Sequence, residues 1–359
     1  MTEIANTIDE LTADWFTSAL REGGTIPPSA AVASATSSLI GTGQLGLVAR
    51  SELDYDGECA GAPRTFVVKL PSADAGSRGM GAAMGVYESE VRFYQEIAPL
   101  LHAAIPRMHW GDVDPASGRF TLVIDDLSQT ADVGDMVGGG TVAQAEIAIA
   151  QLAALQAPIW NDPCLTDKAW LSIDKTEMLF GAVAPAFELF AERFGERVSA
   201  EHLELARGLV PKAAGSARRL WQPPYVVAHG DYRLDNMMFG RGPGAPPLAV
   251  IDWQAARLGP PLLDAAIYLG SCLTAPERRE HEERLLRIYH ERLRAAGIDD
   301  FSWDDVLNSY RVSSLYPFLL TIAVSVTLER TERGDQMWAQ MFTASAGIAA
   351  DTDAAALLA

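Results

Sequence analysis

The stretch that decides the fold reads His229-Gly230-Asp231-Tyr232-Arg233-Leu234-Asp235-Asn236. It follows the apolar run Val226–Ala228, so a short strand would deliver it to a loop, where side chains can reach a ligand. Asp231 and Asn236 lie five residues apart. With this spacing on a loop, one side chain can face a hydroxyl group while the other faces a metal.

A second polar site follows sixteen residues after Asn236. Ile251-Asp252-Trp253 ends the apolar run Leu248–Ile251, so Asp252 also stands at the end of a predicted strand. Carboxylate and amide oxygens are the ligands that Mg²⁺ prefers. Two strands that present Asp231, Asn236 and Asp252 together therefore suit Mg²⁺, and we expect these strands to form a short hairpin.

Upstream, residues 41–48 read G-T-G-Q-L-G-L-V, with glycines at Gly41, Gly43 and Gly46. In a dinucleotide-binding fold such glycines end a strand and open a helix. Here strand-like runs flank them, and turn residues rather than a helix follow Leu47–Leu53. This favours a β-hairpin whose backbone amides cover phosphates, and a plain flexible hairpin is the alternative.

Lys69 ends the apolar run Phe66–Val68, where an unpaired ammonium would be costly. Glu90 lies 21 residues later on a predicted helix, directly before Val91, and is the expected counter-charge. Glu88 is the competing candidate. The pair alone is compatible with a purely structural ion pair as well as with a phosphate-binding one.

The order of elements predicts an α+β fold with two parts. Helix signals at Thr12 and Gly23-Gly24 precede short strand-like runs and one helix over residues 85–101. After Asp126 the chain becomes mainly helical, with capping-box patterns at Thr141 with Gln144 and at Thr274 with Glu277. We expect a strand-rich part with one helix over residues 1–126 and a larger, mainly helical part over residues 127–359.

The amino-acid composition excludes some classes of binding partner. The 359 residues include 28 Lys and Arg against 47 Asp and Glu, a net charge of −19. A surface with this much negative charge repels nucleic acid and anionic lipid. We therefore expect neither of them as a partner. The polar N-terminus, three scattered cysteines and an apolar stretch of only 14 residues, Leu315–Leu328, predict a cytoplasmic protein without a membrane span.

These motifs, in this order, resemble the aminoglycoside phosphotransferase and choline kinase superfamily over roughly residues 10–350. YESEVRFYQEIAPLL, TLVIDDLS and IDWQAARLGPPLLDAAIYL look most similar to its ecdysteroid-kinase-like branch, as found in bacteria. The resemblance implies a two-lobed, protein-kinase-like fold. This sequence departs from the family pattern at Gln156, a position where relatives often carry a histidine.

The resemblance also implies roles for individual residues. Asp231 would accept or orient the acceptor hydroxyl, and Asn236 and Asp252 would hold Mg²⁺. The remaining nucleotide contacts would come from the glycine stretch, from Lys69 held by Glu90, and from the backbone of Asp125 to Leu127 at the adenine. His229 would be structural, and Asp264 would brace the loop. Arg233 has two interpretations, a γ-phosphate contact or a solvent-facing side chain.

The predicted function is therefore transfer of the γ-phosphate of ATP, with GTP as the other possible donor, to a hydroxyl of a small molecule. The resemblance to the ecdysteroid-kinase-like branch, together with the aromatic and aliphatic character of the helical part, favours a steroid- or lipid-like alcohol over an aminoglycoside or a hydroxyacyl-CoA. Two other classes compete: a nucleotide-binding scaffold without catalysis, and a metal-dependent hydrolase that uses His229, Asp231 and Asp252. A nicotinamide oxidoreductase is excluded because no helix follows the glycine stretch. The oligomeric state has no signal in the sequence.

Overall fold

The computed structural model describes residues 2–41, 45–57, 59 and 61–358. The chain divides into two compact units. The first comprises Met1–Pro99, Ala104–Ala131 and Val250–Ala255, and the second comprises Leu100–Ala103, Asp132–Ala249 and Ala256–Ala359. The segment around Asp252 thus belongs to the first unit, although in sequence it lies far inside the helical part.

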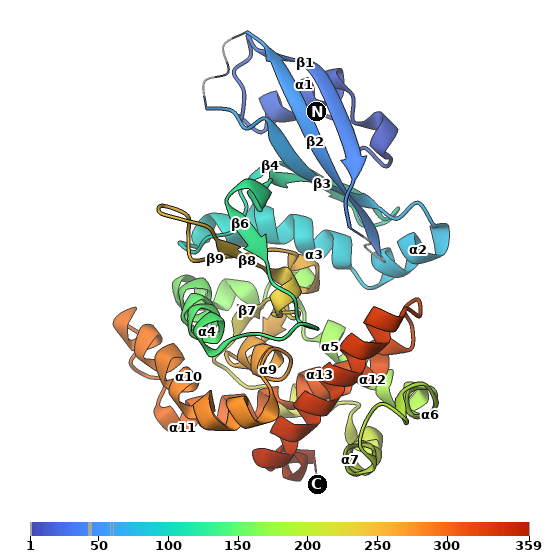
Figure 1. The fold of residues 1–359 in the computed structure, drawn as a ribbon, viewed down its shortest axis with the longest axis vertical. Helices are drawn as coiled ribbons and strands as arrows, with labels where there is room; N and C mark the ends of the chain where they lie inside the picture. Colours follow the sequence, from blue (N-terminus) through green and yellow to red (C-terminus); the bar gives the residue numbers. More distant parts are fainter. Residues whose placement is uncertain (1, 42–44, 58, 60, 359) are drawn as a thin grey trace. The chain divides into compact units, whose positions relative to one another are not determined.

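The first unit is built on a five-stranded antiparallel sheet in the order β1-β2-β3-β5-β4 (Figure 1). Its strands are β1 (Ala31–Leu39), β2 (Gly46–Asp56), β3 (Thr65–Pro71), β4 (Met108–Asp114) and β5 (Arg119–Asp125). Its helices are α1 (Ala13–Glu22), α2 (Ala75–Ala83) and α3 (Val86–Arg92). A π-helical turn, Phe93–Ile97, continues α3.

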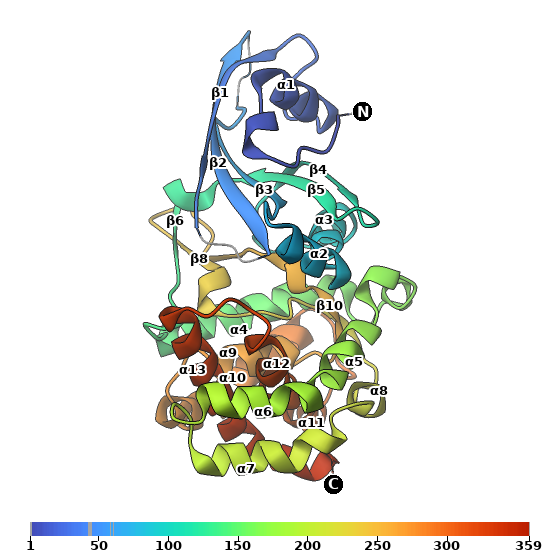
Figure 2. The same cartoon turned by 90° about the vertical axis from the view of Figure 1, so that its right-hand side faces the viewer.

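Helices cover both faces of this sheet (Figure 2). Successive side chains of a strand point to opposite faces. Val68 pairs with Val123, and both join the buried cluster that contains Phe16 of α1. The neighbouring pair, Lys69 and Leu122, therefore lies on the other face. This alternation turns the ammonium of Lys69 away from α1.

The predicted start and end of α1 are confirmed. The Thr12 side chain accepts a hydrogen bond from the amide of Trp15, and Gly23 ends the helix. Within the first unit, α2 and β4 were not predicted. Glycine disfavours helix, and α2 contains Gly76, Gly79 and Gly81; its Asp74 cap and its packing outweigh that preference.

The second unit is mainly helical. Its helices are α4 (Val142–Gln156), α5 (Asp174–Gly181), α6 (Val183–Phe194), α7 (Ala200–Leu209), α8 (Ser216–Leu220), α9 (Leu263–Leu269), α10 (Ala275–Ala295), α11 (Trp303–Ser313), α12 (Leu315–Ser325) and α13 (Glu332–Asp351). The expected capping boxes at Thr141 with Gln144 and at Thr274 with Glu277 are both present.

The short strands of this part pair differently from the expectation. β7 (Val226–Ala228) pairs with β10 (Arg257–Gly259), whereas β9 (Leu248–Val250) lies beside β8 (Met237–Gly240) in the order β6-β8-β9, where β6 is Ala131–Val133. The predicted hairpin between β7 and β9 is therefore wrong. Strands of three residues carry too few side chains for the sequence to specify their partners.

One stretch, Val142–Ile159, has the length and apolar composition of a membrane-crossing helix. In the structure 44% of it is buried, with Ala148, Ile149 and Leu152 among its buried residues. A core helix meets the same two criteria, so length and composition alone are weak evidence for a span.

Candidate active site

The first unit contains three charged side chains that contact one another, two of them largely buried. The Nζ of Lys69 donates to Oε1 of Glu90 at 2.6 Å and to Oδ1 of Asp252 at 2.7 Å. The three side chains are 14%, 3% and 27% exposed, respectively. The structure thus brings Lys69 and Glu90 together as predicted, and it adds Asp252, which lies 183 residues from Lys69 in sequence.

The partner of Lys69 on α3 is Glu90 rather than Glu88. Glu90 is 2% exposed, whereas Glu88 faces Arg92 one turn along at 3.9 Å near the surface. Burial alone would lower the pKa of Lys69, but Asp252 and Glu90 outweigh it and raise that pKa above its ordinary value. Lys69 therefore stays protonated and holds both carboxylates.

The pKa of Glu90 predicts a pH effect on stability. Burial, reinforced by Asp252, raises the pKa of Glu90 from 4.5 to about 7 against the attraction of Lys69. A carboxyl whose pKa is higher in the folded protein contributes stability below pH 4.5 that is lost as the pH rises through about 7. Glu90→Gln should therefore show a flatter fall in unfolding free energy over this range, measured by urea denaturation. Glu88→Gln should follow wild type, and parallel curves for wild type and Glu90→Gln would contradict the assignment.

The glycine stretch joins two paired antiparallel strands. Leu39 of β1 pairs with Ala49 of β2, and Gly46 is the first residue of β2. Gly41 has a φ of 72°, a conformation that favours glycine. Gly43 lies outside the described residues. The described residues on either side of the stretch therefore belong to paired strands, and β2 rather than a helix follows it.

The predicted adenine contacts lie where β5 ends. The Asp125 carboxylate accepts from the amide of Arg107 at 2.9 Å and bonds Nε2 of His109 at 2.8 Å. Burial raises the pKa of Asp125, but these hydrogen bonds outweigh it and lower that pKa overall. Leu127 opens a 3-10 turn that Asp126 caps. No role was predicted for His109, because a lone histidine shows no spacing that would indicate this contact.

In the second unit, the loop after β7 gathers Asp231, Arg233 and Asn236. The Nδ2 of Asn236 donates to Oδ2 of Asp231 at 2.9 Å and to its backbone oxygen at 2.8 Å. Arg233 donates through Nε to Oδ1 of Asp231 at 2.8 Å. Each carboxylate oxygen of Asp231 thus has a fixed donor. Arg233 is 18% exposed and lies against Asp231 rather than in solvent.

A chain of alternating charges extends from this loop. Arg233 also donates through Nη1 to Asp235 at 2.5 Å. Arg333, at the start of α13, bonds Asp235 at 3.1 Å and Asp135 at 2.8 Å. Arg233 therefore pairs with Asp231 and Asp235, and Arg333 pairs with Asp235 and Asp135. The sequence did not predict this network, because its members come from three separate segments.

Asp264 of α9 binds the backbone of this loop, as expected. Its carboxylate accepts the backbone amides of His229 at 2.7 Å and Gly230 at 2.9 Å. Burial raises the pKa of Asp264, against the nearby His229 and these two amides. Nδ1 of His229 in turn accepts the amide of Asp231 at 3.2 Å, and His229 is 1% exposed. The loop is thus held through its backbone.

Removing this brace should destabilise the protein. Asp264→Ala leaves two buried amide donors without their acceptor, and each costs about 1–3 kcal/mol. We expect a loss of about 3 kcal/mol in unfolding free energy, measured by urea denaturation. Asp264→Asn keeps one acceptor oxygen and should lose less. Equal losses in the two variants would show that the hydrogen bonds do not account for the effect.

The proposed metal ligands fit Mg²⁺ in their chemistry. Because Asn236 donates through Nδ2 to Asp231, its Oδ1 lies on the side away from that carboxylate. Asp252 adds a partly exposed carboxylate in the first unit. Among the described residues, no group of three or more His, Cys, Asp or Glu side chains could hold a metal. Two protein ligands suit Mg²⁺, which usually keeps water and phosphate oxygens in its shell.

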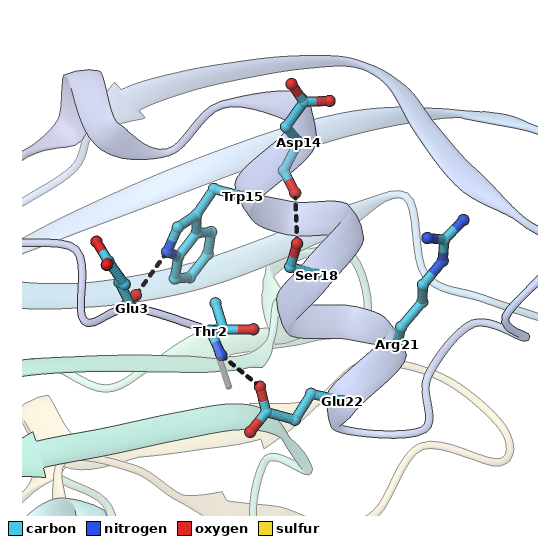
Figure 3. Close-up of a pocket in the computed structure, with 7 residues that line it drawn as sticks. All are labelled: Thr2, Glu3, Asp14, Trp15, Ser18, Arg21 and Glu22. Carbon is cyan, nitrogen blue, oxygen red and sulfur yellow. Dashed lines mark hydrogen bonds between the residues drawn. The ribbon is translucent and has the colours of Figure 1, made fainter.

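A separate surface depression lies at the N-terminus, in the first unit (Figure 3). Its lining residues are Thr2, Glu3, Asp14, Trp15, Ser18, Arg21 and Glu22. Trp15 donates through Nε1 to the carbonyl of Glu3 at 2.9 Å, and the Thr2 amide donates to Glu22 at 2.7 Å. None of the predicted site residues lines it, and these contacts tie the N-terminal segment to α1.

A profile of the phosphotransferase enzyme family matches residues 59–300, which include Lys69, Glu90, Asp231, Asn236 and Asp252. The chain belongs to this family. The predicted membership of the aminoglycoside phosphotransferase and choline kinase superfamily is confirmed. No curated protein sequence matches this phosphotransferase significantly.

Solved structures share the fold at low sequence identity. A Ralstonia eutropha protein with a provisional assignment as an aminoglycoside phosphotransferase is 16% identical, with a TM-score of 0.51 over 95% of this chain and 98% of its own. The phosphotransferase APH(2")-IIIa, solved with GDP and kanamycin, is 12% identical, with a TM-score of 0.51 over 87% and 91%. Plasmodium vivax ethanolamine kinase is 12% identical, with a TM-score of 0.51 over 87% of this chain and 81% of its own. The predicted α+β, kinase-like fold is confirmed.

Proposed function

We propose that this phosphotransferase moves the γ-phosphate of ATP, with Mg²⁺, to a hydroxyl of a small molecule. The observation that carries the proposal is the buried contact of Lys69 with Glu90 and Asp252. An ammonium kept charged by two carboxylates, one of them partly exposed, is suited to bind phosphate oxygens beside a metal ligand.

The roles follow from the contacts. Lys69 would bind the α- and β-phosphates, and the backbone of Asp125 to Leu127 would bind the adenine. Asp231 would orient the acceptor hydroxyl and take its proton, because Asn236 and Arg233 fix both of its oxygens. Asn236 and Asp252 would hold Mg²⁺, which would supply positive charge to neutralise the phosphates. Since the transition state of phosphoryl transfer is largely dissociative, positioning and charge neutralisation supply most of the rate.

The acceptor we propose is an uncharged, apolar alcohol of steroid or lipid type. Arg233 and Arg333 already bind the carboxylates of Asp231, Asp235 and Asp135. These carboxylates are therefore poor sites for a polycationic aminoglycoside. Met337, half-buried on α13, contacts Arg233 at 3.4 Å and adds apolar surface there. Aminoglycosides and hydroxyacyl-CoA thioesters are the alternatives for an acceptor screen.

Titration calorimetry tests the nucleotide site. Wild type should bind a non-hydrolysable ATP analogue with micromolar, magnesium-dependent affinity, and Asp252→Ala should lose the magnesium dependence. A GTP analogue provides the second arm, since APH(2")-IIIa was solved with GDP. No binding of either analogue by folded wild type would overturn the proposal.

Two rival functions can be separated in the same way. A scaffold would bind nucleotide but show no transfer with any acceptor. A hydrolase that uses His229 as a metal ligand would lose metal binding in His229→Ala, whereas we expect metal binding to remain. The buried position of His229 and its bond to the Asp231 amide favour a structural role. We also place the enzyme in the cytoplasm, because Cys59, Cys164 and Cys272 are free thiols.

A further inference from the structure

His109 occupies a β-bulge in β4. Met108 pairs with Ile124 of β5 and Trp110 pairs with Val123, so His109 is the extra residue between two successive pairs. A bulge re-aims a side chain, and bulges are frequent next to active sites. The side chain of His109 is 1% exposed. The bulge therefore places an imidazole ring in the interior of the first unit.

The ring of His109 lies between two hydrogen-bond partners. Its Nε2 is 2.8 Å from Oδ1 of Asp125, and its Nδ1 is 2.8 Å from the hydroxyl of Thr25. Asp125 is ionised at neutral pH, since its pKa is lowered overall, and a carboxylate only accepts hydrogen bonds. Nε2 therefore carries a hydrogen and donates it. In the neutral ring, Nδ1 then accepts the hydroxyl hydrogen of Thr25.

Asp125 is held on both sides of its carboxylate. Its Oδ2 accepts the amide of Arg107 at 2.9 Å, and its own amide donates to the carbonyl of Arg107 at 3.0 Å. The next carboxylate, Asp126, bonds Nε of Arg50 on β2 at 2.8 Å. These bonds fix the direction of the backbone as it leaves β5 and enters the segment from Asp125 to Leu127.

Thr25 connects this arrangement to the N-terminal helix. Its amide donates to the carbonyl of Leu20 in α1 at 2.8 Å, so the end of α1 sets its position. Gly23 lies against β4 at the same place, where a Cβ would be 1.6 Å from the carbonyl oxygen of His109. The absence of a side chain thus allows α1 to pack directly on the bulge. Both Thr25 and α1 precede residue 59, where the family profile begins to match.

We propose that His109 is the positioning residue of the adenine-binding segment, and that Thr25 at the end of α1 orients it. The inference rests on the proposed function, because it assigns the segment from Asp125 to Leu127 to the nucleobase. The two hydrogen-bond partners of His109 are assigned neither to the phosphates nor to Mg²⁺. Loss of His109 should therefore affect binding of the base and leave binding of the phosphates unchanged.

His109→Leu tests this separation with two probes in titration calorimetry. Without the ring, the end of β5 can leave its bound position, and the apparent affinity falls with the fraction of molecules that stay competent to bind. Since a hydrogen bond to a charged group is lost, affinity for a non-hydrolysable ATP analogue should fall about tenfold. Affinity for magnesium tripolyphosphate, which lacks the nucleoside, should stay within about twofold of wild type, because the phosphate contacts are retained.

Three further variants identify the hydrogen bonds as the cause. His109→Gln keeps an amide donor for Asp125 and should recover most of the affinity. Thr25→Val removes only a hydroxyl and should weaken binding of the ATP analogue about threefold, again without an effect on tripolyphosphate. This variant carries the test if His109→Leu does not fold. Phe16→Leu removes a fully buried ring of α1 and should lower the melting temperature while the ratio of the two affinities stays unchanged.

The outcomes separate this inference from the proposed function. If folded wild type binds neither probe, the proposed function itself fails. If wild type prefers the ATP analogue but His109→Leu and Thr25→Val keep that preference, or weaken both probes equally, the positioning role of His109 is overturned and the proposed function stands. If wild type binds both probes equally, the adenine contact fails, and the role of His109 fails with it.

Discussion

Asp231→Asn is expected to lower phosphoryl transfer by about 10²–10⁴-fold, the usual contribution of a positioned general base. The amide cannot accept the proton of the acceptor hydroxyl. It also loses the charge that pairs with Arg233 at 2.8 Å. Nucleotide binding should remain within a few-fold of wild type, because Asp231 contacts the acceptor in the proposed mechanism. The measurements are turnover of ATP with the acceptor found by screening, and calorimetry with the non-hydrolysable analogue.

Asp135→Asn is the matched control for this variant. It removes a carboxylate of the same charge network, but Asp135 bonds Arg333 and is 57% exposed. We expect turnover within a few-fold of wild type. Turnover by Asp231→Asn within tenfold of wild type would remove Asp231 from the chemistry and leave it a structural part of the loop.

Lys69→Met is expected to reduce the unfolding free energy by about 3–5 kcal/mol, as removal of one partner of a buried ion pair usually does. Glu90, with its side chain 3% exposed, would lose its counter-charge and lie near Asp252. The loss should be smaller at pH 5 than at pH 8, because Glu90 takes up a proton as the pH falls through about 7. Nucleotide binding should be lost as well.

A double-mutant cycle tests this account. Lys69→Met with Glu90→Gln should be more stable than Lys69→Met alone, since the buried charge is gone. Urea denaturation of the four proteins at pH 5 and pH 8 measures the coupling. Strictly additive losses would mean that the two side chains do not interact in the folded protein.

The sequence predicted features that depend on local signals. Helix caps at Thr12, Thr141 and Thr274 were found where expected, because a cap requires only side chains a few residues apart. Glu90 was preferred to Glu88 from its apolar neighbours alone. The family and the kinase-like fold were predicted from a resemblance that rested on several motifs in order: the glycine stretch, Lys69, Glu90, residues 229–236 and Asp252.

Contacts between distant segments were decided by the tertiary structure. Lys69 bonds Asp252, Phe93 stacks on Trp253, and β7 pairs with β10 rather than β9. Hydrophobic periodicity shows which face of an element is buried, but several buried faces could serve as its partner. Burial energy is non-directional, so only the packing of the whole chain selects the partner. That packing brings Tyr87 to Leu45, Glu90 to Lys69 and Phe93 to Trp253.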